Sequence, residues 1–211
     1  MAMSVQVFCD DRFHPAATVR EGLAPLGRDW SFVWTDNVHE WKPESLADFP
    51  AVILSKSNTA SATDWSPWLV GGKETAFRDY VRAGGGLLIV HSGCASYAQV
   101  EPMRAVTGGA FTHHPPACEV TIESTDDHAL TAGVDARFSV FDEHYFVTLD
   151  DLDADVFLRS RSSHGMQPSG WTRREGAGRV CVLTPGHFAQ VWLHPSFQKL
   201  LANALRWVSA S

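Results

Sequence analysis

The stretch Arg82-Ala83-Gly84-Gly85-Gly86-Leu87-Leu88-Ile89-Val90-His91-Ser92-Gly93-Cys94-Ala95-Ser96-Tyr97 decides the fold. Its three glycines end a helix, and the unbroken apolar run Leu87–Val90 follows them. Such a run between glycines is typical of a strand that is buried on both faces, as in a parallel sheet under helices. His91 and Ser92 begin the polar segment at the carboxyl end of this strand, where open α/β sheets bind their ligands.

Strands and helices alternate through the first half of the chain. Apolar or alternating runs predict four strands, at Val5–Cys9, Trp30–Trp34, Ala51–Leu54 and Leu87–Val90. Helices are expected at Pro15–Leu26 and Lys73–Arg82, with a helical turn at Pro43–Phe49. This order predicts an α/β fold with a mostly parallel sheet, right-handed crossovers and helices on both faces.

The second half changes character, because additional antiparallel strands are expected there. After a helix at Tyr97–Val106, broken near Pro102, and a loop at 108–115, the pattern predicts strands at Cys118–Glu123, Arg137–Val147 and Val156–Ser160. Glycines in the turn 175–178 predict a hairpin that joins Trp171–Arg174 to Arg179–Thr184. An amphipathic helix, Pro195–Val208, closes what we expect to be a single domain over residues 1–211.

Composition and charge narrow the classes of function. The chain has 211 residues and a net charge of −7, without a basic run, so nucleic acid or an acidic membrane is not expected as a partner. Residues 1–11 lack the basic and apolar segments of an export signal, and no later run could span a bilayer. These features predict a cytoplasmic protein with a small-molecule ligand, and they leave homo-oligomerisation open.

Histidines that follow strands are the first candidates for chemistry. His91 and His187 each come directly after a buried apolar run. His113 and His114 are adjacent, so in an extended chain only one of them can line a shared site. We expect His91, His114 and His187 to surround one cleft, with or without a divalent metal ion. HExxH and HxH spacings are absent, so the pattern does not identify a metal.

Glu143 is the candidate carboxylate. Strict alternation along Arg137–Val147 would place Asp142 and His144 on a solvated face and Glu143 on the other, beside Phe141, Tyr145 and Val147. A carboxylate among apolar neighbours must be paired or functional, because burying it alone is costly. The structural alternative is a salt bridge to Arg159 or Arg173.

Cys94 is a weaker candidate for a nucleophile. Its surroundings resemble a nucleophile elbow, G-x-[SC]-x-G, but Gly93 directly precedes Cys94 and residue 96 is serine. We therefore predict that Cys94 is structural.

Several segments together resemble the trehalose-utilisation (ThuA-like) family, from about Phe77 to the end and more loosely over the first strands. The matching pieces are Phe77–Tyr80 with the glycines 84–86 and the strand ending in His91, Gly108-Gly109-x-Phe111 with His114-Pro115, Asp142-Glu143-x-Tyr145, Trp171-Thr172-Arg173 with Gly176-x-Gly178-Arg179-Val180, Gly186-His187, and Trp207 in the closing helix.

The resemblance implies a flavodoxin-like fold of the class I glutamine-amidotransferase-like superfamily. In those amidotransferases a nucleophilic cysteine stands where His91-Ser92 stands here, so the resemblance argues against glutamine hydrolysis. It implies a role in carbohydrate metabolism, on a disaccharide or an oxidised keto-sugar.

The sequence leaves three functions open. The first is an enzyme that uses His91, Glu143 and His187 as catalytic groups and binds a sugar through Ser92, His114, Tyr145 and Trp65. The second is a non-catalytic sugar-binding or interaction module, and the third is a cysteine amidase with Cys94 and His187. Convergence of the first set of residues in one pocket would favour the enzyme.

Overall fold

The computed structural model describes residues 2–125, 128–150 and 154–210. Its nine-stranded sheet has the order β2-β1-β3-β4-β11-β10-β9-β6-β7. The first five are parallel: β2 Trp30–Thr35, β1 Met3–Phe8, β3 Ala51–Leu54, β4 Gly86–Val90 and β11 Gly178–Leu183. The spatial order of these five strands is that of flavodoxin-like folds. The predicted α/β class is therefore confirmed.

The antiparallel strands extend the sheet on one side, as predicted. They are β10 Gly165–Glu175, β9 Asp155–Ser162, β6 Cys118–Ser124 and β7 Arg137–Asp142. The β10–β11 hairpin turns at Gly176, which has a φ of 60°. A separate two-stranded sheet pairs β5 Gly109–His113 with β8 Phe146–Leu149.

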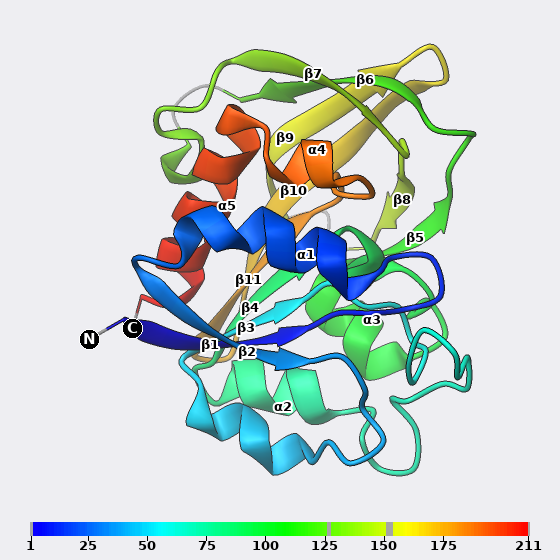
Figure 1. Cartoon of the computed structure of the whole chain (residues 1–211), viewed down its shortest axis with the longest axis vertical. Helices are drawn as coiled ribbons and strands as arrows, with labels where there is room; N and C mark the ends of the chain where they lie inside the picture. The colour runs from blue at the N-terminus through cyan, green and yellow to red at the C-terminus, as the bar shows by residue number, and fades with distance from the viewer. Residues whose placement is uncertain (1, 126–127, 151–153, 211) are drawn as a thin grey trace.

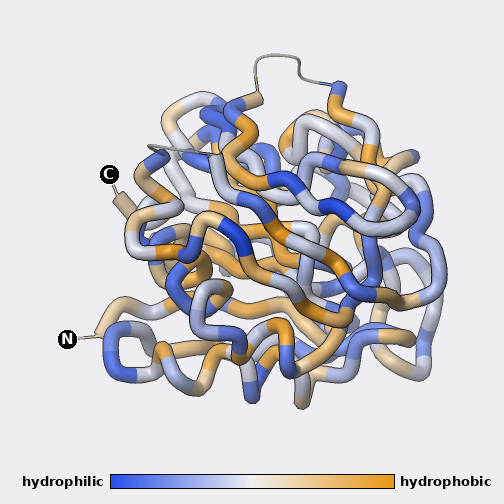
Figure 2. The backbone as a smooth tube through the Cα atoms, turned by 90° about the horizontal axis from the view of Figure 1, so that it is seen from above, coloured by the Kyte–Doolittle hydropathy of each residue, from blue (hydrophilic) through white to orange (hydrophobic). Residues whose placement is uncertain are grey.

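Helices cover both faces of the parallel strands (Figure 1). One face carries α1 Ala16–Leu23, α4 Ala189–Trp192 and α5 Pro195–Val208, and the other carries α2 Ala76–Arg82 and α3 Glu101–Thr107. Four 3₁₀ helices complete the described elements, at Ala24–Leu26, Pro43–Asp48, His91–Cys94 and Ala129–Thr131. Successive side chains of β4 enter opposite cores, so every residue of this strand is buried. The hydrophobic segments accordingly run through the middle of the molecule in Figure 2.

The turn after β4 is sharp and tightly packed. His91 has a φ of 47°, which is in the left-handed region that non-glycine residues seldom adopt. Two residues later, a Cβ on Gly93 would collide with the carbonyl oxygen of Leu54. The sequence Ser92-Gly93 thus lets the chain pass close to β3 and turn the His91 ring beneath the edge of the sheet.

Three expectations about the elements are wrong. Pro102 does not break a helix, because it lies in the first turn of α3, where its missing N–H is tolerated. The segment 108–115, expected as a loop, contains β5. The single strand expected at Arg137–Val147 is two strands in different sheets, because the chain leaves the main sheet after Asp142 and pairs with β5 from Phe146 onward.

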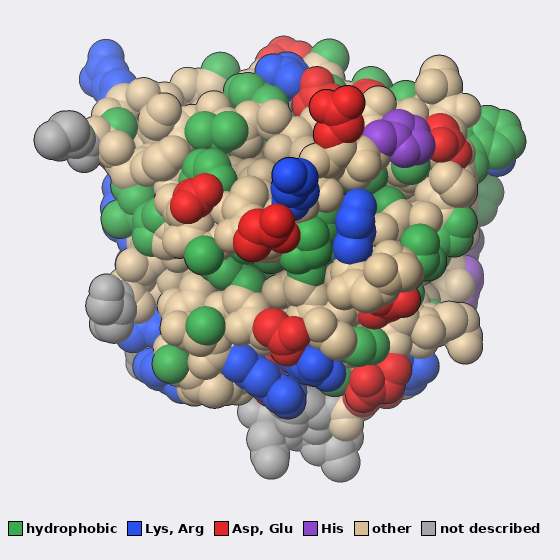
Figure 3. Space-filling model, turned by 90° about the horizontal axis from the view of Figure 1, so that it is seen from below, with side chains coloured by type: hydrophobic (Ala, Val, Ile, Leu, Met, Phe, Trp, Pro, Cys, Tyr) green, Lys and Arg blue, Asp and Glu red, His purple; other side chains and the backbone are tan. Residues whose placement is uncertain are grey.

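Two surface features lie away from the carboxyl ends of the strands. Acidic and basic side chains are interspersed over the face seen from below in Figure 3. A cavity of about 570 Å³ lies between α2 and the 3₁₀ helix Pro43–Asp48, next to the amino ends of β3 and β4. Within the described ranges, no helix is both long and apolar enough to cross a membrane.

Candidate functional site

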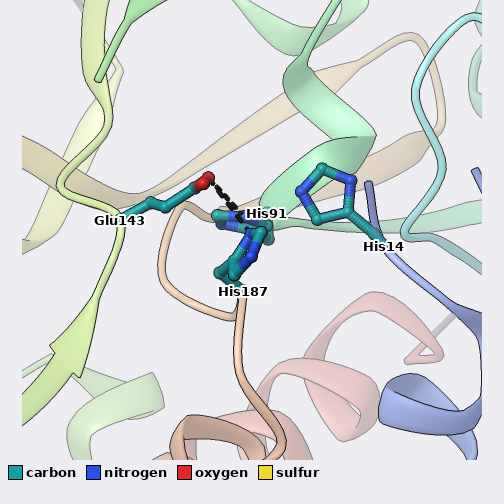
Figure 4. A group of neighbouring side chains, drawn as sticks. All are labelled: His14, His91, Glu143 and His187. Atoms are coloured by element: carbon teal, nitrogen blue, oxygen red, sulfur yellow. Dashed lines mark ion pairs between the residues drawn. The ribbon is translucent and has the colours of Figure 1, made fainter. Parts of the chain in front are cut away.

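Three histidines and one glutamate converge at the carboxyl ends of the parallel strands (Figure 4). His14 follows β1, His91 follows β4 and His187 follows β11, while Glu143 comes from the connection between β7 and β8. Each side chain offers one nitrogen or oxygen atom to the cluster, and these four atoms all lie within 4.8 Å of one another. We call this set of four residues the histidine–glutamate cluster.

His91 forms the floor of the cluster. Its Nδ1 lies 2.8 Å from the carbonyl oxygen of Thr184, which can only accept, so Nδ1 carries the proton and Nε2 is bare. The ring stacks on Tyr145 with centroids 4.1 Å apart, and Nε2 is buried without a hydrogen-bond partner. Burial lowers the pKa of His91 to about 4, so the ring is neutral at physiological pH.

His14 is held by a buried carboxylate from its own loop. Its Nδ1 lies 2.7 Å from Asp11 Oδ1, and Asp11 also accepts hydrogen bonds from the backbone N–H groups of Phe13, His14 and Ser57. Although burial opposes ionisation, the hydrogen bonds to Asp11, above all that from His14, hold its pKa well below the usual range. The other ring nitrogen of His14, Nε2, is buried and has no hydrogen-bond partner in the part of the chain that the structure describes.

A buried lysine fixes the loop that carries His14. Lys56 follows β3, is fully buried, and donates from Nζ to the backbone carbonyls of Asp10 and Asp36. The hydroxyl of Tyr97 in turn donates to the carbonyl of Lys56. These contacts join the ends of β1 and β3, so His14 is positioned by groups from both strands.

His187 is positioned through Asp142, the last residue of β7. Asp142 accepts the backbone N–H groups of Gly186 at 2.8 Å and His187 at 2.9 Å, which ties the loop after β11 to β7. Even with these bonds, burial raises the pKa of Asp142 to about 7. His187 Nδ1 lies 3.2 Å from Glu143 Oε2 but is not aligned for a hydrogen bond.

The two carboxylate oxygens of Glu143 face different groups. Oε2 lies 3.5 Å from His91 Nε2 and 3.2 Å from His187 Nδ1, whereas Oε1 lies 3.6 Å from His114 Nε2. Burial alone would raise the pKa of Glu143, but its contacts with His187 and His91 hold it below the usual range. The carboxylate raises the pKa of His187 in return. Among the described residues, the side chains that face the Glu143 carboxylate are thus imidazoles rather than a guanidinium.

A cavity of about 640 Å³ opens above the cluster. Its walls include His14 and five of the site residues predicted from the sequence, namely Trp65, His114, Glu143, Tyr145 and His187. Among the described residues that line it, neither His91 nor Ser92 appears, because both side chains are buried beneath the floor. His91 can therefore act on a ligand only through the groups above it.

The rim of this cavity is aromatic and cationic. Trp65 and Phe13 are 53% and 64% exposed, although both line the cavity. The guanidinium carbon of Arg12 lies 3.4 Å from the centre of the Trp65 ring and 4.9 Å from that of Phe13. This rim presents flat apolar surface beside a positive charge.

The sequence patterns do not identify every member of the site. His14 is missing from the predicted residues, although it follows β1 as His91 follows β4, and this position after a parallel strand is the feature that would identify it. His114 lies at the rim, with its side chain 35% exposed, rather than in the cluster. The expectation that Asp142 and His144 are solvated is wrong, since both are 1% exposed. Asp142 lies on the buried face of β7 with Phe138 and Val140, whereas Phe141 is on the opposite face and is 51% exposed.

Cys94 occupies a structural position. Its thiol is buried and lies 3.0 Å from the carbonyl oxygen of His91, to which it donates. Burial raises the pKa of the thiol to about 12, which is far from that of a thiolate nucleophile at neutral pH. The prediction that this cysteine is not a nucleophile agrees with both observations.

The fold and the cluster define a flavodoxin-like α/β protein with a histidine–carboxylate site at the ends of its parallel strands. The chain belongs to the trehalose utilisation (ThuA) family, whose model matches residues 6–208. Among curated proteins, no match is found.

Solved structures of similar fold cover nearly the whole chain. A ThuA-like protein from Bacteroides uniformis has 19% identity and a TM-score of 0.77 over 98% of this chain and 91% of its own. A ThuA-like protein from Parabacteroides merdae has 14% identity and a TM-score of 0.77 over 100% and 91%. The β-galactosidase of Rahnella sp. R3 matches 98% of this chain with 32% of its own length, at 13% identity and a TM-score of 0.65. At these identities the likeness concerns the fold.

Proposed function

We propose that this protein is an enzyme of carbohydrate metabolism that acts on a disaccharide or a keto-sugar in the 640 Å³ cavity. The observation that carries the proposal is the convergence of His14, His91, Glu143 and His187 from four separate segments. A structural ion pair needs two partners, whereas here one half-buried carboxylate faces three imidazoles and a cavity. Membership of the trehalose utilisation family supports a sugar as the substrate.

The chemistry that suits these groups is proton transfer next to a carbonyl. A ketone makes the adjacent C–H acidic, so a base can remove this proton while the electron pair moves to the carbonyl oxygen as an enolate. Glu143 is the base in this scheme, because the neighbouring histidines keep its carboxylate ionised and its Oε1 points toward the rim. Reprotonation at a neighbouring carbon gives isomerisation, and departure of a β-substituent gives elimination.

The enolate oxygen needs a positive partner from the cluster. His187 lines the cavity, and its pKa is raised by Glu143, so a protonated imidazole could donate a hydrogen bond to this oxygen. A cation bound at the cluster would serve the same purpose. Both routes depend on Glu143 and lead to the same class of product.

The rim offers a surface for the sugar ring. Aromatic faces pack well against the C–H surfaces of sugars, and Trp65 presents its exposed face at the mouth of the cavity. Arg12, stacked on this ring, can donate hydrogen bonds to sugar hydroxyls. His114, at the rim, and the buried Tyr145 complete the proposed binding surface.

The test is Glu143→Gln, assayed on a panel of disaccharides and their keto derivatives. We expect the variant to keep the fold and most of the ligand affinity while its turnover falls by roughly a hundredfold or more, as losses of a general base do. Glu119→Gln is the matched control, because Glu119 is exposed on β6. Normal turnover by Glu143→Gln would refute the assignment, and a large drop in Tm with no other effect would favour a non-catalytic sugar-binding module.

A further inference from the structure

Three ring nitrogens in the histidine–glutamate cluster have no hydrogen-bond partner among the described residues. They are all buried, and they belong to three different strand ends: His14 Nε2, His91 Nε2 and His187 Nδ1. Leaving one buried polar atom unpaired costs about 1–3 kcal/mol, so native structures keep such atoms rare. Three of them around one point, beside a carboxylate, indicate that the point is normally occupied by a species that accepts their lone pairs.

Two of these nitrogens are held as acceptors by the rest of the protein. His14 donates from Nδ1 to Asp11, and His91 donates from Nδ1 to the carbonyl of Thr184, so in both rings the lone pair is on Nε2. A carboxylate or a backbone carbonyl behind the imidazole is the usual outer partner of a metal-bound histidine, which it orients and makes more basic. His91 is also buried below the cavity, so a ligand to a metal ion is a role it can fill without touching substrate.

We propose that the cluster binds one divalent transition-metal ion through four atoms, namely His14 Nε2, His91 Nε2, His187 Nδ1 and Glu143 Oε2. Ligands at 2.0–2.2 Å from an ion lie at most about 4.4 Å apart. The four atoms lie within 4.8 Å of one another, so movements of less than about an ångström would bring them to bonding distance of one ion. Imidazole nitrogens select transition metals over Mg²⁺ and Ca²⁺.

The number of protein ligands narrows the choice of ion. Four ligands would fill a tetrahedral site, whereas an ion that accepts six, such as Mn²⁺, Fe²⁺ or Co²⁺, keeps two positions for other ligands. His14, Glu143 and His187 line the cavity, so these positions face it. Two neighbouring positions suit two neighbouring oxygens, as in a hydroxyl next to a ketone.

The choice of a keto-sugar as the molecule that binds to the ion rests on the proposed function, to which it adds the metal ion. The ion, rather than a protonated His187, polarises the ketone and stabilises the enolate oxygen. Glu143 then binds the ion through Oε2 and keeps Oε1, which faces His114, as the proton acceptor. His114 lies outside the metal site, at the rim of the cavity.

The experiment measures metal binding without any assay of activity. The full chain, purified without a histidine tag and stripped with a chelator, is titrated calorimetrically with Mn²⁺, Co²⁺ and Zn²⁺. We expect one ion per chain and at least ~100-fold weaker binding for His14→Gln and for His187→Gln, since even outer partners of metal ligands contribute 10–100-fold. The control His164→Gln, in the exposed turn between β9 and β10, should change the affinity by no more than about threefold. A wild-type protein that binds none of the ions, or equal losses in His14→Gln and His164→Gln, would overturn the site.

Two measurements on the wild-type protein do not depend on how the variants fold. An anomalous difference map from Co²⁺-soaked crystals should place a peak among the four ligand atoms, and a peak elsewhere would overturn the assignment. A keto-disaccharide should shift the visible spectrum of the Co²⁺ form, whereas its parent disaccharide should not. Identical spectra would contradict the proposal that the ketone and hydroxyl oxygens bind to the ion. Full turnover after chelation would show that catalysis does not need the ion, and it would leave the proposed enzymatic function in place. A protein that binds the metal but turns over none of the sugars would keep the metal site and contradict the proposed function.

Discussion

Replacing Asp11 by asparagine tests how the cluster is held together. Asp11 accepts four hydrogen bonds, three at Oδ1 and one at Oδ2 from Ser57 N–H. An asparagine that keeps its oxygen at the Oδ1 position points its NH₂ group at the Ser57 N–H, and the flipped amide turns the NH₂ group toward His14. Either way at least one hydrogen bond to a charged group is lost, at about 1.5–3 kcal/mol.

The expected effects can be worked out from these contacts. For a domain of this size 1 kcal/mol shifts Tm by about 2–4 °C, so Asp11→Asn should melt roughly 3–12 °C lower. The pKa of Asp11 is lowered in the folded state, so its ionised form stabilises the protein above the ordinary value of 3.8, and this contribution is lost as the pH falls. The difference in Tm should therefore be full at neutral pH and shrink below about pH 4.

The functional readout is the affinity for Mn²⁺ or Co²⁺. Without its carboxylate partner the His14 ring is free to change tautomer and orientation, so we expect binding to weaken by about 10–100-fold. Asp10→Asn is the matched control: it removes the same charge one residue away, and asparagine tolerates the φ of 72° found at Asp10. An Asp11→Asn protein with the Tm and metal affinity of the Asp10→Asn control would refute the reasoning.

Other predictions concern the turn after β4 and the rim of the cavity. Cys94→Ser should keep turnover within a few-fold, because a serine hydroxyl can also donate to the carbonyl of His91; stoichiometric labelling of Cys94 by a substrate-like electrophile with loss of turnover would contradict this. Gly93→Ala should prevent folding or lower Tm strongly, because its Cβ meets the carbonyl of Leu54, and a normal melting curve would count against the packing described. Trp65→Ala should raise KM for a sugar with little change in kcat, and unchanged kinetics would remove the rim from binding.

The sequence predicts the parallel half of the fold well because its signals are local. Apolar runs bounded by glycines predict β4, and the carboxyl-end rule predicts that His91 and His187 lie together on adjacent strands. Most tryptophans are buried in the core, as large aromatic side chains usually are, and Trp192, for example, is fully buried.

The rest depends on contacts that no local pattern encodes. Alternation along Arg137–Val147 does not say which face is buried, and Asp142 lies on the face of β7 that packs into the core. Beyond Asp142 the strand does not continue, because Phe146 pairs with His113 of β5, so the alternation cannot be extended to His144. The choice of His14 over His114 depends on the loop after β1, which brings the His14 ring close to His187 although β3 and β4 separate β1 from β11. Asp11 and Lys56 belong to the same set of long-range contacts, which sequence spacing cannot show.

The most direct test of the central claim follows one labelled keto-disaccharide by ¹³C NMR with the metal-loaded protein. Binding in the cavity and conversion are observed in the same sample, with Glu143→Gln as the second arm. We predict that the wild-type protein binds the sugar and replaces its signals by those of an isomer or an elimination product, while Glu143→Gln binds it and leaves it unchanged. A wild-type protein that binds the sugar through Trp65 and His114 and returns it unchanged would contradict the account.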